Sequence, residues 1–134
     1  MEPERPITCE SISAIVRFLP VFEVDAFEAG RWVASGGGFP SCSYSDDVLA
    51  FLKALRDAGW VAPFDWQAWQ EEAAQYVESP RMLESADLET VRRLLTLIVR
   101  KERFCEGLLL GMFEGGTIAA LLRRLSHIRD TLPQ

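Results

Sequence analysis

Residues 86–100, ADLETVRRLLTLIVR, carry the strongest helical periodicity in the chain. Their apolar side chains recur every three or four positions, the spacing that gathers them on one face of an α-helix: Leu88, Val91, Leu94, Leu95, Ile98 and Val99. Ser85 or Asp87 can cap the first turn. The intervening arginines, Arg92, Arg93 and Arg100, are expected to point outward. The segment therefore predicts an amphipathic helix that packs against other helices.

Two further helices are predicted in the first half of the chain. Thr8 can cap a helix whose regular part ends or kinks at Pro20, because proline lacks an N–H and restricts the residue before it. Ser45 can cap a second helix that Gly59 ends in a left-handed conformation.

The aromatic segment PFDWQAWQ, residues 63–70, opens a predicted helix over 66–77. Asp65 is placed as its N-cap, and Phe64 can close over Trp69 as a hydrophobic staple. Bulky aromatic residues at a helix start are more often core anchors than an aromatic cage or a base-stacking surface. Core packing is therefore the preferred interpretation.

In the C-terminal third, the sequence predicts a kink near residues 101–103. A very apolar helix follows the kink and ends at the glycine pair 115–116. Cys105 falls on the apolar stripe of that helix and is expected to be buried. Thr117 is predicted to cap the last helix, whose apolar face is Ile118, Leu121, Leu122, Leu125 and Ile128.

Residues 21–44 form a long irregular connection, because three consecutive glycines and a proline disfavour a helix there. A minimal hairpin from residues 31–33 and 42–44 fits the pattern. The connection is expected to be ordered and packed onto the helices, since it carries too much aromatic surface to leave in water: Phe27, Trp32, Phe39 and Tyr44.

Together these elements predict an all-α fold, a compact bundle of five or six helices with one long glycine-rich connection. The length of 134 residues suits a single domain over 1–134, of which residues 1–7 are expected to be flexible. Hydrophobic residues make up 49% and charged residues 25% of the chain, as in ordinary globular proteins.

Cysteine usage and hydropathy predict a cytoplasmic protein without a membrane segment. Cys9, Cys42 and Cys105 are odd in number and form no CxxC pair, unlike a disulfide framework or a structural zinc site. No apolar run approaches the roughly 20 residues that span a bilayer. The N-terminus lacks the basic start and apolar middle of a secretory signal.

The charge balance argues against nucleic acid as a partner, because the net charge is −6. The charge is uneven: residues 1–80 hold 5 basic and 13 acidic side chains, and residues 81–134 hold 9 basic and 7 acidic ones. Attraction between the two parts within one fold explains this asymmetry most simply.

No catalytic residue, metal site or cofactor is predicted. Cys105 and His127 could be a nucleophile and a base, but they fall on an apolar and a polar helix face respectively. Glu102 and Glu106 share a predicted helical face, yet the Glu-x-x-His motifs of two-metal bundle sites are missing. A packed thiol, a surface histidine and plain ion pairs explain these residues.

Three stretches resemble a family of small bacterial domains of unknown function: FDWQAW at 64–69, ADLETVRRLLTLIVRKERFCEG at 86–107 and FEGGTIAALLRRL at 113–125. The shared pattern is FDWxxW, VRKxRFxEG and FExGxIxxLLRRL. The resemblance runs from about residue 18 to the last helix. It implies a bacterial origin and a stand-alone domain, but no activity or cofactor.

The favoured function is a non-enzymatic interaction or regulatory module that acts through a protein partner or its own dimer. A basic cluster is the candidate surface for an acidic partner or a phosphate: Arg100, Lys101, Arg103, Arg123 and Arg124. The alternative is a small-ligand-binding protein or enzyme with an aromatic cleft between residues 31–44 and the start of the 66–77 helix. Its candidate residues are Trp32, Phe39, Tyr44, Trp66 and Trp69.

Overall fold

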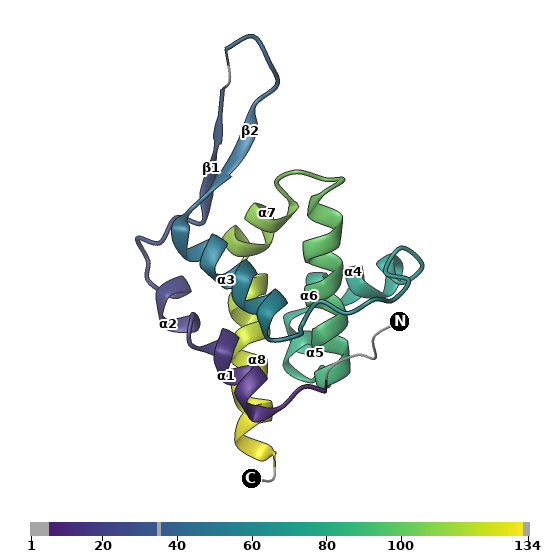
Figure 1. Ribbon diagram of the computed structural model, residues 1–134. Helices are drawn as coiled ribbons and strands as arrows, with labels where there is room; N and C mark the ends of the chain where they lie inside the picture. Colours follow the sequence, from purple (N-terminus) through teal and green to yellow (C-terminus); the bar gives the residue numbers. More distant parts are fainter. Residues whose placement is uncertain (1–5, 35, 133–134) are drawn as a thin grey trace.

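The computed structural model describes residues 6–34 and 36–132, and this part of the chain is mostly helical (Figure 1). It holds eight helical segments and one two-stranded antiparallel sheet, so the predicted helical fold is confirmed. The segments outnumber the expected helices because two short ones were not predicted, α2 Leu19–Phe22 and α5 Pro80–Glu84. Helix α7, Leu108–Glu114, is the predicted apolar helix before the glycine pair. The expected flexibility of residues 1–7 concerns residues that lie mostly outside the described ranges.

Helix α1, Cys9–Val16, begins as predicted. The Thr8 side chain accepts a hydrogen bond from the Ser11 backbone N–H at 3.2 Å, and the Ser11 hydroxyl accepts one from the Thr8 N–H. Pro20 does not end this helix, which stops earlier, at Val16. It lies in the first turn of α2 instead, where its missing N–H costs no hydrogen bond.

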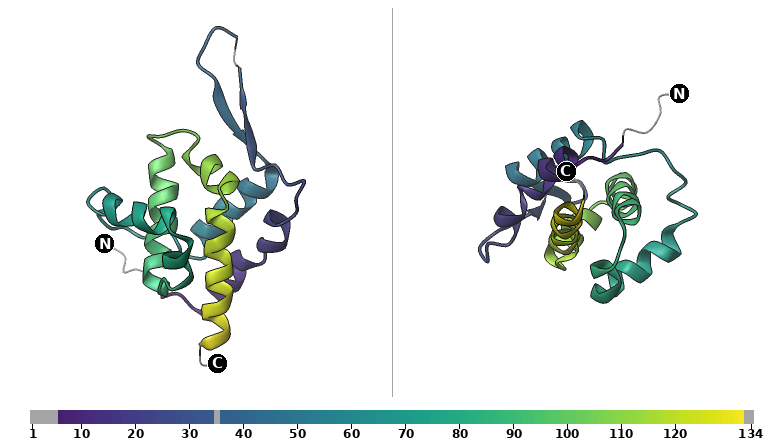
Figure 2. Two further views of the ribbon diagram at one scale, coloured as in Figure 1. Left: turned by 180° about the vertical axis from the view of Figure 1, so that it is seen from behind. Right: turned by 90° about the horizontal axis from the view of Figure 1, so that it is seen from below.

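The glycine-rich connection contains the hairpin, formed by β1 Gly30–Val33 and β2 Ser41–Tyr44. It projects away from the helices (Figures 1 and 2). The expectation that it packs onto them is wrong for Phe39, which is 94% exposed. Trp32 is 51% exposed, but one part of its ring lies against Gly107. A two-stranded ribbon reaches past the helices, and the hairpin residues that pack against the core, Cys42 and Tyr44, belong to β2.

Helix α3, Asp46–Asp57, has the predicted cap, since the Ser45 hydroxyl accepts a hydrogen bond from the Val48 N–H. Gly59 follows it with a φ of 80°. Helix α4, Gln70–Glu78, starts later than predicted. Asp65 accepts from the Ala68 N–H at 3.2 Å and so closes a turn over 66–69 rather than the first turn of the helix.

Helix α6, Leu88–Glu102, is capped by Asp87, whose carboxylate accepts a hydrogen bond from the Thr90 N–H at 2.8 Å. The prediction that Arg92 points outward is wrong. Its side chain is 5% exposed and donates from Nη2 to the Gly59 carbonyl at 2.8 Å. The buried carbonyl of a distant turn attracts this arginine, a contact that helical periodicity does not report.

The expected kink after α6 is a full break, residues 103–107. Gly107, with a φ of 96°, ends this loop and starts α7 in a new direction. Cys105 therefore lies exposed in the loop, and the prediction that it is buried on a helical stripe is wrong. Helix α8, Thr117–Thr131, is preceded by Gly116 at a φ of 81°, so Thr117 is its first residue rather than its cap.

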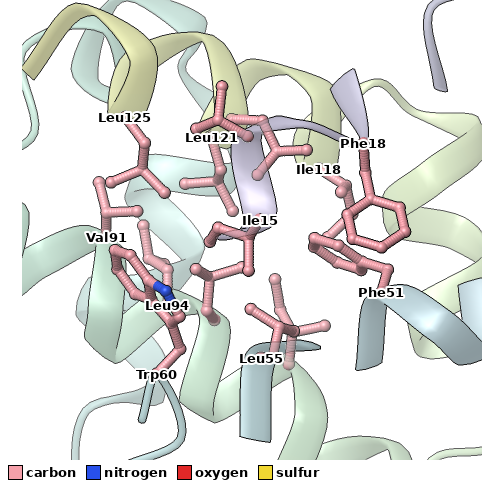
Figure 3. Close-up of a cluster of buried hydrophobic side chains, with 14 of the residues drawn as sticks. Ile15, Phe18, Phe51, Leu55, Trp60, Val91, Leu94, Ile118, Leu121 and Leu125 are labelled. Atoms are coloured by element: carbon pink, nitrogen blue, oxygen red, sulfur yellow. The ribbon is translucent and has the colours of Figure 1, made fainter. Parts of the chain in front are cut away.

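The core surrounds α8, which runs beside α1 and α6 (Figures 2 and 3). Leu121, Leu122 and Leu125 are fully buried there, as predicted. Each such side chain stabilises the fold by about 1.5–3 kcal/mol. Trp60 is also fully buried, and its ring N–H donates to the Ser11 carbonyl at 2.8 Å.

Buried hydrogen bonds tie α6 to the segment that links α3 and α4. The Thr96 hydroxyl donates to the Trp60 carbonyl at 3.0 Å and accepts from the Ala62 N–H at 3.1 Å. Together with Arg92 these contacts fix residues 59–62 against the helix. This positions the aromatic residues that follow beside the C-terminal end of α6. No helix within the described ranges is long and apolar enough to cross a membrane.

Candidate functional site

Three adjoining hollows run along the C-terminal end of α6, and Arg103 lines all of them. The middle hollow, about 290 Å³, lies between the C-terminal ends of α3 and α6; it is lined by Arg56, Val61, Val99, Arg100 and Arg103. We call the three together the arginine groove. Its residues come from α3, from residues 61–66, from α6 with the loop that follows it, and from the start of α7.

The arginines of the groove lie where two helices end. Arg56 is in the last turn of α3, Arg100 is in the last turn of α6, and Arg103 is the C-cap of α6. A positive side chain near a helix C-terminus is stabilising by about 0.3–1 kcal/mol through the helix dipole. The helix dipole explains why basic residues occur at these positions. It does not explain why arginines from two helices line the same groove.

Two of these arginines have no side-chain partner in the part of the chain that the structure describes. Among the described residues, the side chains of Arg100 and Arg103 form no hydrogen bond and no ion pair. Other arginines are engaged: Arg93 pairs with Glu89 at 3.4 Å, and Arg123 pairs with Glu23 at 3.2 Å. The guanidinium groups of Arg100 and Arg103 are therefore available to an external anion.

One end of the groove is aromatic, with a volume of about 360 Å³. Phe64, Trp66 and Phe104 line it together with Arg100 and Arg103. The Trp66 and Phe104 rings are 6.1 Å apart and inclined by 33°. Phe104 is nevertheless 74% exposed, so most of this ring faces solvent. Among residues 6–34 and 36–132, no acidic side chain lines this end or the middle of the groove.

The opposite end of the groove is acidic and carries a structural clamp. Glu102 and Glu106 line it beside Arg103. The Glu102 carboxylate accepts hydrogen bonds from the Tyr44 hydroxyl at 2.8 Å, the Leu109 N–H at 2.8 Å and the Gly107 N–H at 3.2 Å. It thus caps α7 and ties the hairpin to the loop.

Tyr44 completes this clamp, since its hydroxyl oxygen also accepts from the Leu110 N–H at 3.1 Å. Burial, followed by the hydrogen bond to Glu102, raises the pKa of the Tyr44 hydroxyl above its usual range. Trp32 lies directly on Gly107, where an added Cβ would come within 2.3 Å of its ring. The base of the hairpin is therefore fixed to the loop that carries Arg103 and Phe104.

The five aromatic residues predicted to line one cleft lie in four places. Trp32 and Tyr44 pack against residues 102–110, and Phe39 lies in the connection between β1 and β2. Trp66 lines the groove. Trp69 contacts Phe64 and Tyr76, and its ring N–H donates to Glu72 at 2.6 Å. The loop after α6 lies between the hairpin and the 61–69 segment (Figures 1 and 2).

The five predicted basic residues are also divided. Arg100 and Arg103 share the groove, and Lys101 lines a hollow beside α4. Arg123 and Arg124 line a separate hollow of about 410 Å³ between α5 and α8. There, Arg124 donates a hydrogen bond to the Ala86 carbonyl at 2.7 Å, and Arg123 forms an ion pair with Glu23. Both guanidinium groups therefore already have partners within the fold.

The sequence interpretation missed Arg56, Phe64 and Phe104 as groove residues. Arg56 was recognisable only as a helix-end cation, and Phe64 only as half of a staple. The two rings of that staple are in contact, with centroids 6.0 Å apart, but they precede α4 and so do not staple its first turn. The part of the chain that the structure describes contains no group of three or more His, Cys, Asp or Glu side chains placed to hold a metal ion.

The sequence profile of a family of unknown function, DUF6508, matches residues 7–131. The chain belongs to this family. No curated protein and no solved structure matches the chain at a significant level. The match spans the helices, the hairpin and every residue of the arginine groove, so the groove lies within the family's domain.

Proposed function

We propose that this protein is a non-enzymatic interaction module that binds an acidic segment of a partner protein in the arginine groove. The observation that carries the proposal is the unpartnered state of Arg100 and Arg103 among the described residues. The chain has 20 acidic and 14 basic side chains, so carboxylates are not scarce. Two arginines that stay unpaired in an acidic protein, and that line the same groove, are suited to an external anion.

An acidic protein segment fits this groove better than a nucleic acid. The net charge of −6 repels a long polyanion, and binding to nucleic acid depends on releasing many counterions. A short acidic segment needs only a few contacts. Arginine is well suited to them, because its planar guanidinium donates to a carboxylate through two parallel hydrogen bonds.

We also propose that the protein is bacterial and cytoplasmic and that its cysteines are reduced. Cys9, Cys42 and Cys105 are all free thiols in the fold, which supports a reducing compartment. The partner is taken to be another protein rather than a second copy of this chain. An ultracentrifugation series across concentrations distinguishes the two, since self-association through the groove would be lost in the groove variant described next.

Isothermal titration calorimetry with a hexaglutamate peptide tests the proposal. We expect the double variant Arg100→Glu/Arg103→Glu to bind the peptide at least about tenfold more weakly than wild type. We also expect the affinity of wild type to decrease as the salt concentration is raised from about 50 to about 300 mM, because salt screens charge-dependent association. The matched control is Arg31→Glu/Arg81→Glu, which changes the charge equally at two exposed arginines outside the groove. Equal weakening by both variants would show that net charge, rather than the groove, attracts the peptide.

A further inference from the structure

The arginine groove is chemically graded along its length. Its aromatic end is lined by Phe64, Trp66 and Phe104, its middle by arginines, and its far end by Glu102 and Glu106. A uniformly acidic ligand would meet two carboxylates at the far end and aromatic rings at the other. The groove therefore suits a segment of mixed chemistry better than a simple run of acidic residues.

Phe104 is the exposed feature of the aromatic end. It lies in the loop after α6, it is 74% exposed, and it contacts Trp66 at a ring distance of 6.1 Å. Trp66 supports the ring from one side only, so a further aromatic ring can pack on the remaining surface. An exposed aromatic ring next to available guanidinium groups is typical of the core of a binding surface, in which aromatic residues and arginine are enriched.

The anion site and the aromatic site adjoin each other. Arg100 and Arg103 line both the aromatic end and the middle of the groove, and Arg103 precedes Phe104 directly in the chain. In an extended peptide, side chains two positions apart point to the same side and lie about 7 Å apart. A ligand segment can thus place a carboxylate on the arginines and an aromatic side chain on Phe104 within a few residues.

The acidic end adds the third element. The Glu102 oxygens already accept three hydrogen bonds, and Glu106, which lines the same end, is exposed. A lysine or arginine in the ligand would be attracted there, whereas another carboxylate would be repelled.

We infer that the groove selects a partner segment in which acidic residues are flanked by an aromatic residue on one side and a basic residue on the other. This inference rests on the proposed function and narrows its ligand. Phe104 supplies the aromatic contact, Arg100 and Arg103 supply the anion contact, and Glu106 supplies the contact to the basic residue.

Calorimetry with four peptides of equal length tests the inference. The parent is acetyl-Gly-Trp-Gly-Glu-Glu-Gly-Lys-Gly-amide; in the others tryptophan is replaced by alanine, lysine is replaced by glutamate, or the order is scrambled. For wild-type protein we expect the parent to bind about tenfold more tightly than the alanine peptide. The glutamate and scrambled peptides should also bind more weakly than the parent.

The variant Phe104→Ala should reduce the affinity for the parent to that for the alanine peptide, and leave the affinity for the alanine peptide unchanged. Phe39→Ala is the matched control, because it removes another exposed phenylalanine, one that lies on the hairpin. If parent and alanine peptides bind wild type equally, or if Phe104→Ala weakens both equally, the inference is wrong while the proposed function stands. If none of the peptides binds, the proposed function itself is wrong.

Discussion

The clamp between Tyr44 and Glu102 offers the sharpest test of how the hairpin is held. Replacing Glu102 with glutamine removes the charge and leaves one acceptor oxygen where the carboxylate accepts three hydrogen bonds. The new amide group also directs N–H donors toward the backbone N–H groups of Gly107 or Leu109. Replacing Tyr44 with phenylalanine removes the hydroxyl that donates to Glu102 and accepts from the Leu110 N–H.

The expected magnitudes follow from these contacts. Hydrogen bonds to charged groups contribute about 1.5–3 kcal/mol each when buried, and this site is only partly buried. We therefore expect Glu102→Gln to lower the free energy of unfolding by about 2 kcal/mol, and Tyr44→Phe by about 1 kcal/mol. Because both changes remove the same O–H to carboxylate bond, the double variant should lose about 1 kcal/mol less than the sum of the single effects.

Urea denaturation followed by circular dichroism measures the cycle, and amide hydrogen exchange at Leu109 and Leu110 shows where the fold opens. Glu106→Gln is the matched control, since it makes the same chemical change at an exposed neighbour and should stay within about 0.5 kcal/mol of wild type. Strictly additive single effects, or a loss at Glu106 as large as that at Glu102, would refute the clamp.

Four further predictions follow from the same structure. The pKa of the Tyr44 hydroxyl is raised in the folded state, so the stability that this hydroxyl contributes is present below about pH 10 and is lost at higher pH. In urea melts between about pH 9 and 11, the free energy of unfolding should therefore decline less for Tyr44→Phe than for wild type. Cys105, exposed in its loop, should react with a thiol reagent in the native protein faster than Cys9 or Cys42, which mass spectrometry of timed samples can establish. Thr96→Val should cost about 2–4 kcal/mol in a denaturant melt, because it leaves the Ala62 N–H and the Trp60 carbonyl without their partner. Gel-shift titration at about 150 mM salt should show no micromolar affinity for random-sequence DNA or RNA, in line with the net charge of −6.

Local sequence signals predicted the starts of three helices, α1, α3 and α6. The caps at Thr8, Ser45 and Asp87 were predictable because the capping side chain and the amide it binds are three residues apart. The buried face of α8 was predictable because its apolar side chains repeat at helical spacing. Both signals are contained within a few turns of chain, so no tertiary information is needed.

The errors arose where a tertiary contact overrides the local pattern. Cys105 has the right spacing for the apolar stripe, but Gly107 takes a left-handed conformation and the helix ends before it. The capping of α7 by Glu102 then stabilises the break, and its partner Tyr44 lies 58 residues away in the chain. Periodicity within one segment cannot report a partner at that distance.

The arginines of α6 show why the candidate site could be predicted only in part. Arg92, Arg93 and Arg100 belong to one helix and were all expected to face solvent. In the structure Arg92 binds a carbonyl of the turn after α3, and Arg93 pairs with a carboxylate one turn away on its own helix. Only the second of these contacts is local enough to be predicted from sequence. Arg100 differs from both, because neither a carbonyl nor a carboxylate among the described residues accepts a hydrogen bond from its guanidinium group. All three residues are arginines of the same helix, so the sequence alone does not separate them. The tertiary contacts of each arginine show which of them is open to a partner.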